Sequence, residues 1–177
     1  MGFGGALWQE VAAGLPGSVE SARIVVRLAV AMALGGVLGM QRAHAGKAAG
    51  MRTHMLVTMG AALVVLLPQL IGMSSADLSR VIQGTLTGIG FIGGGVILKM
   101  NDQHQIVGIT TASSIWLTAT VGIVTGAGRL GLAVVAAALA FIILTMFGRF
   151  EHQLIAAHAA ERAGNAGAAN SPLDRVL

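Results

Sequence analysis

Five apolar windows, each about as long as a membrane-crossing helix, constrain this chain more than any other feature of its sequence. They run approximately over Ile24–Met40, Met55–Ile71, Val81–Leu98, Ile106–Thr125 and Leu130–Phe147. A helix needs about 20 mostly apolar residues to cross the hydrocarbon core of a bilayer. Only 10% of the residues are charged, whereas soluble domains have about 25%. The sequence therefore predicts an all-α membrane protein, a bundle of about five transmembrane helices.

The windows divide the chain into three regions. Residues 1–22 lack the basic start and long apolar run of a cleavable signal peptide, so we expect a retained segment at the membrane interface. Residues 23–148 hold the transmembrane domain. Residues 149–177 are predicted to form a short helix and a flexible tail, which is too polar and too small for a second core. Cysteine is absent, which excludes disulfides and thiolate metal sites.

Basic residues lie at the boundaries of the windows, although the sequence pI of about 11.2 alone would also fit a nucleic-acid-binding protein. Such a protein gathers its lysines and arginines on a soluble surface, so we expect membrane lipid and no nucleic acid as the partner. With five crossings, one side of the membrane receives Arg42, Lys47, Arg52, Lys99, Arg149 and Arg162, and the other receives Arg23, Arg27, Arg80 and Arg129. The positive-inside rule then favours the N-terminus outside and the C-terminus inside.

Glycines four residues apart recur within the windows. The pairs are Gly35 and Gly39, Gly84 and Gly88, Gly90 and Gly94, and Gly122 and Gly126. Small residues with this spacing let helix backbones approach closely in lipid, which predicts glycine-rich packing faces. In the third window, the run from Gly93 to Gly95 leaves a second interpretation open: a broken helix whose free backbone groups bind ions.

Charged residues near one membrane boundary form a second group. Arg23 and Arg27 share a helical face, and Glu20 lies one turn earlier as a local partner. The arginines could simply extend toward the interface. Alternatively, Asp77, which the topology places on the same side together with Arg80, could form an ion pair with one of these arginines.

Hydroxyl groups are unusually frequent in the fourth window. They belong to Thr110, Thr111, Ser113, Ser114, Thr118, Thr120 and Thr125. Each could bond to a carbonyl of its own helix, or together they could line a small polar passage. Trp116 interrupts this run and is expected to anchor packing.

Nothing in the sequence indicates an enzyme or a cofactor. No window holds a pair of carboxylates, and no nucleophile motif is present. His44 and His54 are assigned to a loop without a spaced carboxylate, and His44, Asp102 and His104 are more typical of solvated side chains than of metal ligands. We therefore expect no catalytic residue, no metal and no cofactor.

Three blocks of the sequence together resemble a known family. They are GMQRAHAGKAAGMRTHMLVTMGAAL (39–63), DLSRVIQGTLTGIGFIGGGVIL (77–98) and GITTASSIWLTATVGIVTGAG (108–128). In order and spacing they resemble the signature of the MgtC/SapB family of bacterial inner-membrane proteins. The resemblance implies a functional motif made of Arg42, Arg52, Thr53, Asp77, Arg80, Gly88, Gly90, Phe91, Gly93, Gly95, Thr110, Thr111 and Trp116. The family commonly has glutamates on both sides of the first arginine, where this chain has Gln41 and Ala43.

The resemblance also implies a function. Members of this family are linked to adaptation to low magnesium, and in pathogens to survival inside macrophages. They are thought to act as regulators through contact with membrane proteins such as the ATP synthase, and we expect the same of this chain, as a homodimer. The alternative is a small homo-oligomeric carrier or channel for an ion or solute, with a polar path between the third and fourth helices.

Overall fold

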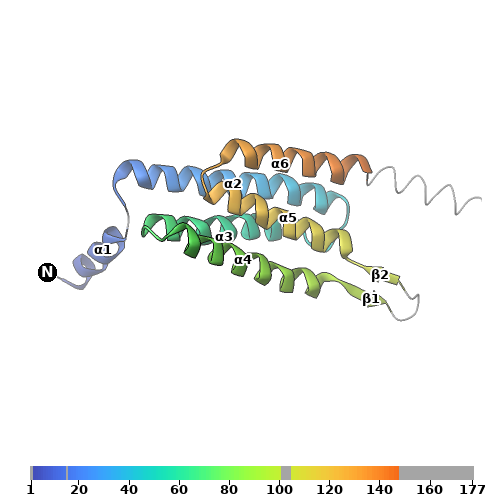
Figure 1. Cartoon of the computed structure of the whole chain (residues 1–177), viewed down its shortest axis with the longest axis horizontal. Helices are drawn as coiled ribbons and strands as arrows, with labels where there is room; N and C mark the ends of the chain where they lie inside the picture. Colours follow the sequence, from blue (N-terminus) through green and yellow to red (C-terminus); the bar gives the residue numbers. More distant parts are fainter. Residues whose placement is uncertain (1, 15, 101–104, 148–177) are drawn as a thin grey trace, which may run out of the picture. The chain divides into compact units, whose positions relative to one another are not determined.

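The computed structural model describes residues 2–14, 16–100 and 105–147, and it consists almost entirely of helices (Figure 1). The helices are α1 (Phe3–Ala13), α2 (Ser18–His44), α3 (Met51–Leu70), α4 (Ser75–Val96), α5 (Ile109–Gly126) and α6 (Leu130–Ile142). A short antiparallel hairpin of β1 (Leu98–Met100) and β2 (Gln105–Val107) connects α4 to α5, and a π-helical segment, η1 (Ile143–Phe147), follows α6. Residues 1–140 form one compact unit, to which the descriptions below refer. The prediction of an all-α membrane protein is confirmed.

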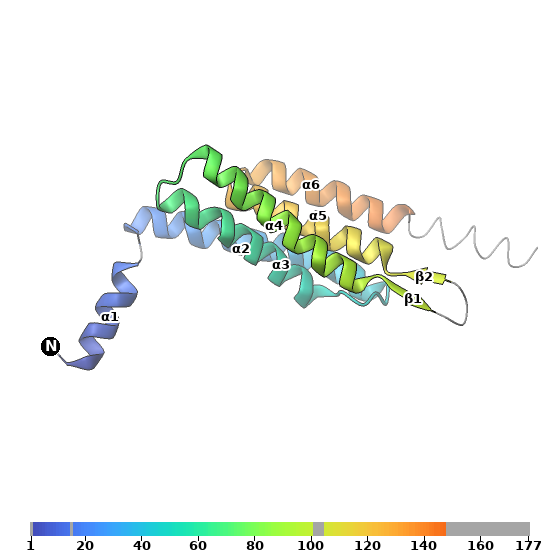
Figure 2. The same cartoon turned by 60° about the horizontal axis from the view of Figure 1, so that its bottom comes forward.

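Four segments are long and apolar enough to cross a membrane: α2, α3, α5 and the stretch Leu130–Phe147. The direction of the chain identifies α4 as a fifth crossing. Gly122 of α5 lies against Thr58 of α3, and Gly126 lies against Ala62, so α3 and α5 run in the same direction. A chain that crosses twice in one direction must return between the two crossings. Helix α4, with 22 residues, is long enough to do so and lies beside both α3 and α5 (Figure 2).

The N-terminal region differs from the expected division at residue 22. Helix α2 already begins at Ser18 and is 27 residues long, so it includes Glu20. Helix α1 precedes it and exposes Phe3, Leu7 and Trp8. The location of α1 at the membrane interface stays a prediction. The predicted C-terminal helix and tail, residues 149–177, lie outside the described residues.

The boundary between the third and fourth windows also differs from expectation, because the hairpin occupies it. The third window was expected to reach Leu98 and the fourth to begin at Ile106, but both residues belong to strands. Gly108 adopts a left-handed backbone with φ 96°, a conformation that favours glycine, and α5 starts only after it. Helix α4 continues through Gly93 and Gly95 to Val96. The interpretation of a broken helix is therefore wrong.

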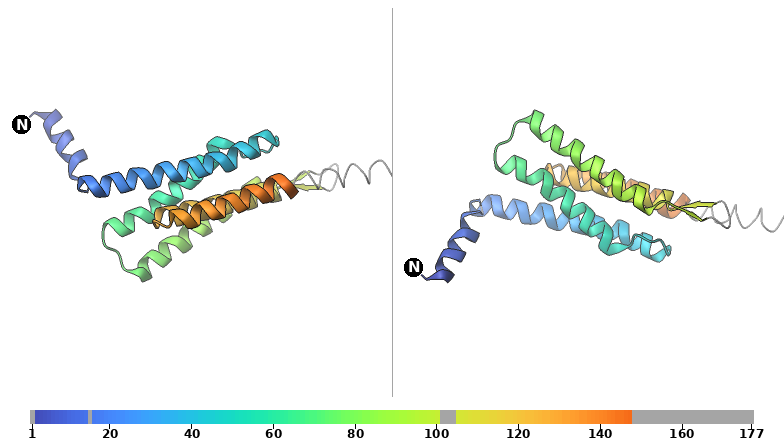
Figure 3. Two further views of the ribbon diagram at one scale, coloured as in Figure 1. Left: turned by 90° about the horizontal axis from the view of Figure 1, so that it is seen from above. Right: turned by 90° about the horizontal axis from the view of Figure 1, so that it is seen from below.

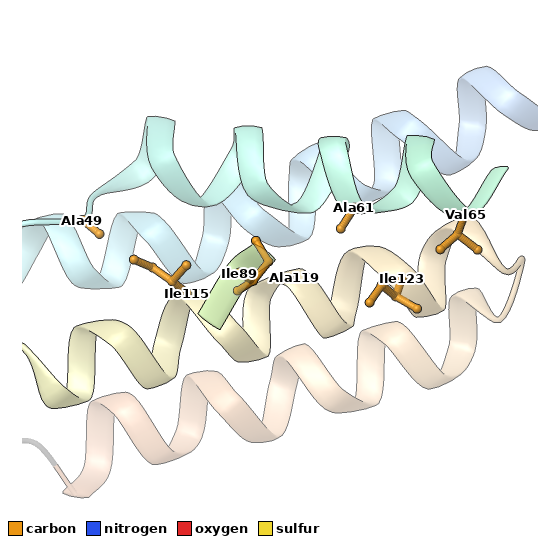
Figure 4. Close-up of a cluster of buried hydrophobic side chains, with 7 residues drawn as sticks. All are labelled: Ala49, Ala61, Val65, Ile89, Ile115, Ala119 and Ile123. Atoms are coloured by element: carbon orange, nitrogen blue, oxygen red, sulfur yellow. The ribbon is translucent and has the colours of Figure 1, made fainter. Parts of the chain in front are cut away.

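The core of the unit forms where α3, α4 and α5 meet. Its buried side chains are Ala49, Ala61, Val65, Ile89, Ile115, Ala119 and Ile123 (Figure 4). Three of the seven are alanines, so the helices pack closely without large side chains between them. Dispersion contacts in such a core depend on this close approach, because a small gap already loses a large part of each contact.

The glycine pairs of α2 and α5 are the points of closest contact. A Cβ atom on Gly39 would lie 2.6 Å from Cα of Met51, and a Cβ on Gly122 would lie 2.9 Å from Cα of Thr58. Real Cβ atoms do not approach backbone atoms so closely, so these positions accept only glycine in this packing. The prediction of close-packing faces is confirmed for Gly35 and Gly39 and for Gly122 and Gly126, which are all buried.

The glycine pairs of α4 behave differently. Gly84, Gly88, Gly90 and Gly94 are exposed, and no described neighbour would lie within 4 Å of a Cβ added to any of them. Only Gly93 is packed, at an ordinary distance of 3.6 Å from Cβ of Ala112. The packing face predicted for this window is thus not used within the described part of the chain.

Large apolar side chains cover the outside of the helices. Exposed examples from α2 to α6 include Val25, Leu56, Leu63, Leu67, Phe91, Leu132, Val135 and Leu139. Figure 3 shows the arrangement of these helices from two sides. Such extensive apolar exposure would cause aggregation in water. It is typical of a surface that contacts lipid.

Candidate functional site

Six polar side chains are buried between α2, α3 and α5. This buried polar cluster consists of Arg42, His54, Thr58, Thr111, Ser114 and Thr118, each with a relative exposure of 7% or less. Polar and ionisable groups inside a membrane protein are costly, and they commonly mark functional sites. The cluster is therefore the candidate functional site of the chain.

Arg42 is the charged member of the cluster. It lies in the last turn of α2, is 3% exposed, and donates from Nη2 to Oγ1 of Thr111 at 2.9 Å. Its Nε atom is buried and has no hydrogen-bond partner. The one ion pair among the described residues joins Glu20 to Arg23. No described carboxylate therefore neutralises Arg42. An arginine buried in this way bears a large desolvation cost.

His54 and Thr58 extend the cluster along α3. His54 Nδ1 donates to the carbonyl oxygen of Gly50 at 3.0 Å, whereas Nε2 is buried without a partner. The hydroxyl of Thr58 donates to the carbonyl oxygen of His54 at 2.8 Å. Gly35 and Gly39 of α2 face His54 and Thr58. Because these glycines have no side chains, His54 and Thr58 can occupy the space beside α2. The assignment of both histidines to a loop is wrong, because His44 is the last residue of α2 and His54 is a fully buried residue of α3.

Most of the hydroxyls on α5 bond within their own helix. Ser113, Ser114, Thr120 and Thr125 donate to carbonyl oxygens three or four residues earlier, at 2.7 to 3.2 Å. Two hydroxyls with no such bond are that of Thr111, whose Oγ1 accepts the hydrogen bond from Arg42, and that of Thr118, whose buried Oγ1 has no hydrogen-bond partner. Groups satisfied in this way are poor ligands for a passing ion. The geometry therefore favours hydroxyls that bond to their own helix over hydroxyls that line a polar passage.

The residues of the functional motif separate into an inner and an outer group. The structure joins Arg42 to Thr111 in the interior and packs Gly93 against α5. Thr53 is half-buried, and exposed members of the motif are Arg52, Arg80, Gly88, Gly90, Phe91, Gly95, Thr110 and Trp116. Phe91 is 86% exposed and Trp116 is 46% exposed. Trp116 is therefore no packing anchor within the described chain.

Arg27 neither extends freely toward the membrane interface nor forms an ion pair with Asp77, the two roles considered from the sequence. Its Nη1 donates to the carbonyl oxygen of Gly126 at 3.0 Å and to Oε1 of Gln69 at 3.4 Å. The cation thus caps the C-terminal end of α5, where the helix dipole favours positive charge. Gly128, with φ 78°, lies against the same guanidinium. The predicted local pair of Arg23 with Glu20 is present, at 3.6 Å and exposed to solvent or headgroups.

Asp77 does not form the predicted contact with an arginine among the described residues. Its Oδ2 accepts a hydrogen bond of 2.7 Å from the hydroxyl of Ser74, and its backbone N–H donates to Oγ of Ser74 at 3.2 Å. The two residues cap the first turn of α4, as is common at helix N-termini. The expected ion pair is absent because the short side chain is held at its own helix end.

Replacing Asp77 with alanine should therefore have only a small effect on stability. Loss of the acidic residue from the first turn is expected to cost about 1 kcal/mol, measured as thermal unfolding of the purified protein in detergent. Ser79→Ala, an exposed position in the same helix, is the control and should cost less. A loss of several kcal/mol for Asp77→Ala would instead indicate a buried ion pair.

His54 and Thr58 were harder to identify from the sequence than the other members of the buried polar cluster. Both lie on one face of α3, four residues apart, in a window of apolar residues. This spacing, opposite a glycine pair of another window, is the signal that could have identified them.

Taken together, the fold and the buried polar cluster define a multi-pass α-helical membrane protein with a basic, tightly packed interior. The chain belongs to the MgtC family, whose family model matches residues 28–153.

Several relatives share this part of the chain. YhiD of Escherichia coli (strain K12), named a "Putative magnesium transporter", is 36% identical over 142 residues, which cover 76% of this chain and 65% of YhiD. SrpB of Synechococcus elongatus is 40% identical over 136 residues, 71% of this chain and 75% of SrpB. Protein MgtC of Brucella abortus is 40% identical over 109 residues, 62% of this chain and 44% of that protein. The matches to YhiD and MgtC thus cover less than two thirds of those proteins. No solved structure matches the chain.

Proposed function

We propose that this chain is a non-enzymatic regulator of the bacterial inner membrane that acts by contact with other membrane proteins during adaptation to low magnesium. The observation that carries the proposal is the outer face of α4. Gly88, Gly90 and Gly95 leave it without bulk, and Phe91 projects from it with 86% exposure. Small residues beside a large aromatic side chain allow another helix to approach closely and gain contact area.

The carrier alternative, which the name of YhiD also suggests, has less physical support. A magnesium path requires oxygen ligands and negative charge, whereas the interior between α2, α3 and α5 contains the cation of Arg42. In the part of the chain that the structure describes, no group of three or more histidine, cysteine or acidic residues could hold a metal ion. The unbroken α4 removes the other part of the proposed path.

Site-specific photo-crosslinking in native membranes tests the regulator. A photoreactive phenylalanine analogue at position 91 is expected to give a discrete adduct with a membrane protein, for which the ATP synthase is the first candidate. The same analogue at Leu139, an exposed position on α6, is the matched control and should give lipid adducts only. If position 91 also gave only lipid adducts, while the purified chain carried magnesium across proteoliposome membranes, the carrier would replace the regulator.

A homodimer through the same face of α4 is a further expectation, because a two-fold pair is the commonest closed assembly. Gly90→Leu and Gly94→Leu add bulk where no described neighbour stands. Each should reduce the dimer fraction at least several-fold while the protomer unfolds at nearly the wild-type temperature. Light scattering in detergent measures the first quantity, and an unchanged dimer fraction in both variants would show that copies do not meet on this face.

The orientation is proposed with the N-terminus outside and the turn Ala45–Gly50 in the cytoplasm. Arg42, Lys47 and Arg52 surround this turn, and the positive-inside rule retains such charges in the cytoplasm. A reporter fused after Gly50 should therefore be active only if it functions in the cytoplasm. Activity of a periplasmic reporter at this position would reverse the orientation.

A further inference from the structure

The buried guanidinium of Arg42 has fewer partners than it can bind. An arginine side chain has five N–H donors, of which one at Nη2 is given to Thr111 and the one at Nε has no hydrogen-bond partner. Hydrogen bonds to a charged group are among the strong ones in proteins, and leaving them unmade in the interior is costly. The protein therefore has a reason to place an acceptor beside Arg42.

Two helix N-termini lie at the same end of the compact unit as Arg42 (Figure 1). Helix α3 begins at Met51, against Gly39 of α2, and α5 begins at Ile109, two residues before the partner of Arg42. Neither helix has a side-chain cap or an acidic residue in its first turn. Each N-terminus has unpaired N–H groups and a partial positive charge. Arg42 lies beside these partial positive charges, and the partial negative charge at the C-terminal end of its own helix α2 offsets only part of its full charge.

No described carboxylate pairs with Arg42 to balance its full charge. The described acidic residues are Glu10, Glu20 and Asp77, and the last two are engaged by Arg23 and Ser74. The positions beside Arg42, where the family commonly has glutamates, are Gln41 and Ala43. Any full counter-charge to Arg42 therefore comes from outside the described chain.

We propose that Arg42 and the N-termini of α3 and α5 form a binding site for a phosphate-type oxyanion. The fork of a guanidinium matches two oxygens of such an anion, and helix N-termini are ready anion sites. Both inorganic phosphate and the phosphate of a lipid headgroup have this chemistry. The site does not depend on the contact function proposed above.

The test is thermal unfolding of the full chain in nanodiscs of zwitterionic lipid, titrated with sodium phosphate against sodium chloride at constant ionic strength. At ten times its dissociation constant, phosphate should raise the wild-type midpoint by about 3 to 6 °C. Arg42→Gln should abolish this rise. Arg52→Gln removes an exposed arginine at the same end and should keep it.

A further variant covers the case in which Arg42→Gln does not fold. Arg42→Lys keeps the positive charge but loses the paired N–H donors of the guanidinium. The phosphate concentration that half-saturates this variant should therefore be at least tenfold higher than that for wild type. In nanodiscs of anionic lipid, a wild-type midpoint that is already raised and no longer responds to phosphate would identify the headgroup as the source.

Three results would overturn the site. One is a flat wild-type titration in zwitterionic lipid together with an identical midpoint in anionic lipid. Another is an equal phosphate response in wild type and Arg42→Gln, which would show nonspecific stabilisation. The third is a flat wild-type titration with a strong destabilisation by Asp102→Asn, because the counter-charge would then belong to the chain itself, from a residue outside the described ones.

Discussion

Replacing Gly122 with leucine is expected to destroy the packing of α5 against α3. Even the first carbon of the new side chain would lie 2.9 Å from Cα of Thr58 and from Cβ of Ala61. Overpacking a core costs about 1 to 3 kcal/mol when side chains can move aside. Here the obstacle includes backbone of α3, so we expect a loss at the top of that range or above it. Chemical or thermal unfolding of the purified protein, followed by tryptophan fluorescence and circular dichroism, measures the loss.

Gly94→Leu is the matched control for this prediction. It introduces the same side chain into a glycine-rich helix, but no described neighbour lies within 4 Å of the new Cβ. Its protomer should unfold within about 0.5 kcal/mol of wild type, as is usual for surface substitutions. A loss for Gly122→Leu as small as that expected for Gly94→Leu would show that the contact between α3 and α5 is not as close as described.

The second large effect is expected for Thr111→Val. Valine has nearly the shape of threonine, so the substitution removes the acceptor of the buried Arg42 hydrogen bond of 2.9 Å and little else. A hydrogen bond to a charged group contributes about 1.5 to 3 kcal/mol. The buried guanidinium would also lose its one described partner. We therefore expect a loss of about 2 to 3 kcal/mol, measured by unfolding in phosphate-free buffer.

Thr118→Val in the same helix is the control. Its hydroxyl is equally buried but has no hydrogen-bond partner, so replacing it with a methyl group should be neutral or stabilising. The pair of variants separates the Arg42 hydrogen bond from the general effect of removing a hydroxyl. A destabilisation by Thr118→Val as large as that by Thr111→Val would indicate an ordered partner for Thr118, such as a bridging water.

The helical architecture could be predicted from the sequence because it depends on apolar length alone. Windows of about 20 apolar residues can satisfy their backbone in lipid only as helices. Each of the five windows accordingly contains a long helical segment, whereas α1 precedes them all. Their ends were less certain. The hairpin between α4 and α5 depends on the left-handed backbone of Gly108, and nothing in the surrounding residues distinguishes that glycine from the others of the window.

The partners of the polar residues could not be predicted, because they depend on the register between helices. Arg27 and Gly126 are far apart in the sequence, and only the antiparallel contact of α2 with α5 joins them. The same contact joins Arg42 with Thr111. For Asp77 the sequence did not reveal that the hydroxyl of Ser74, three residues earlier, would be its hydrogen-bond partner in place of an arginine. Glycine spacing predicted close contacts on four faces, but which of these faces are occupied within the protomer depends on the topology.

The shared direction of α3 and α5 has a consequence for how the chain enters the membrane during synthesis. Helix α4 must cross, yet it falls outside the group of segments that are apolar enough to do so by composition. A segment of this kind partitions into lipid poorly when it leaves the insertion machinery alone. Its neighbours α3 and α5 supply the contacts that compensate for its glycines and polar residues. We therefore expect the insertion of α4 to depend on its contacts with α3 and α5.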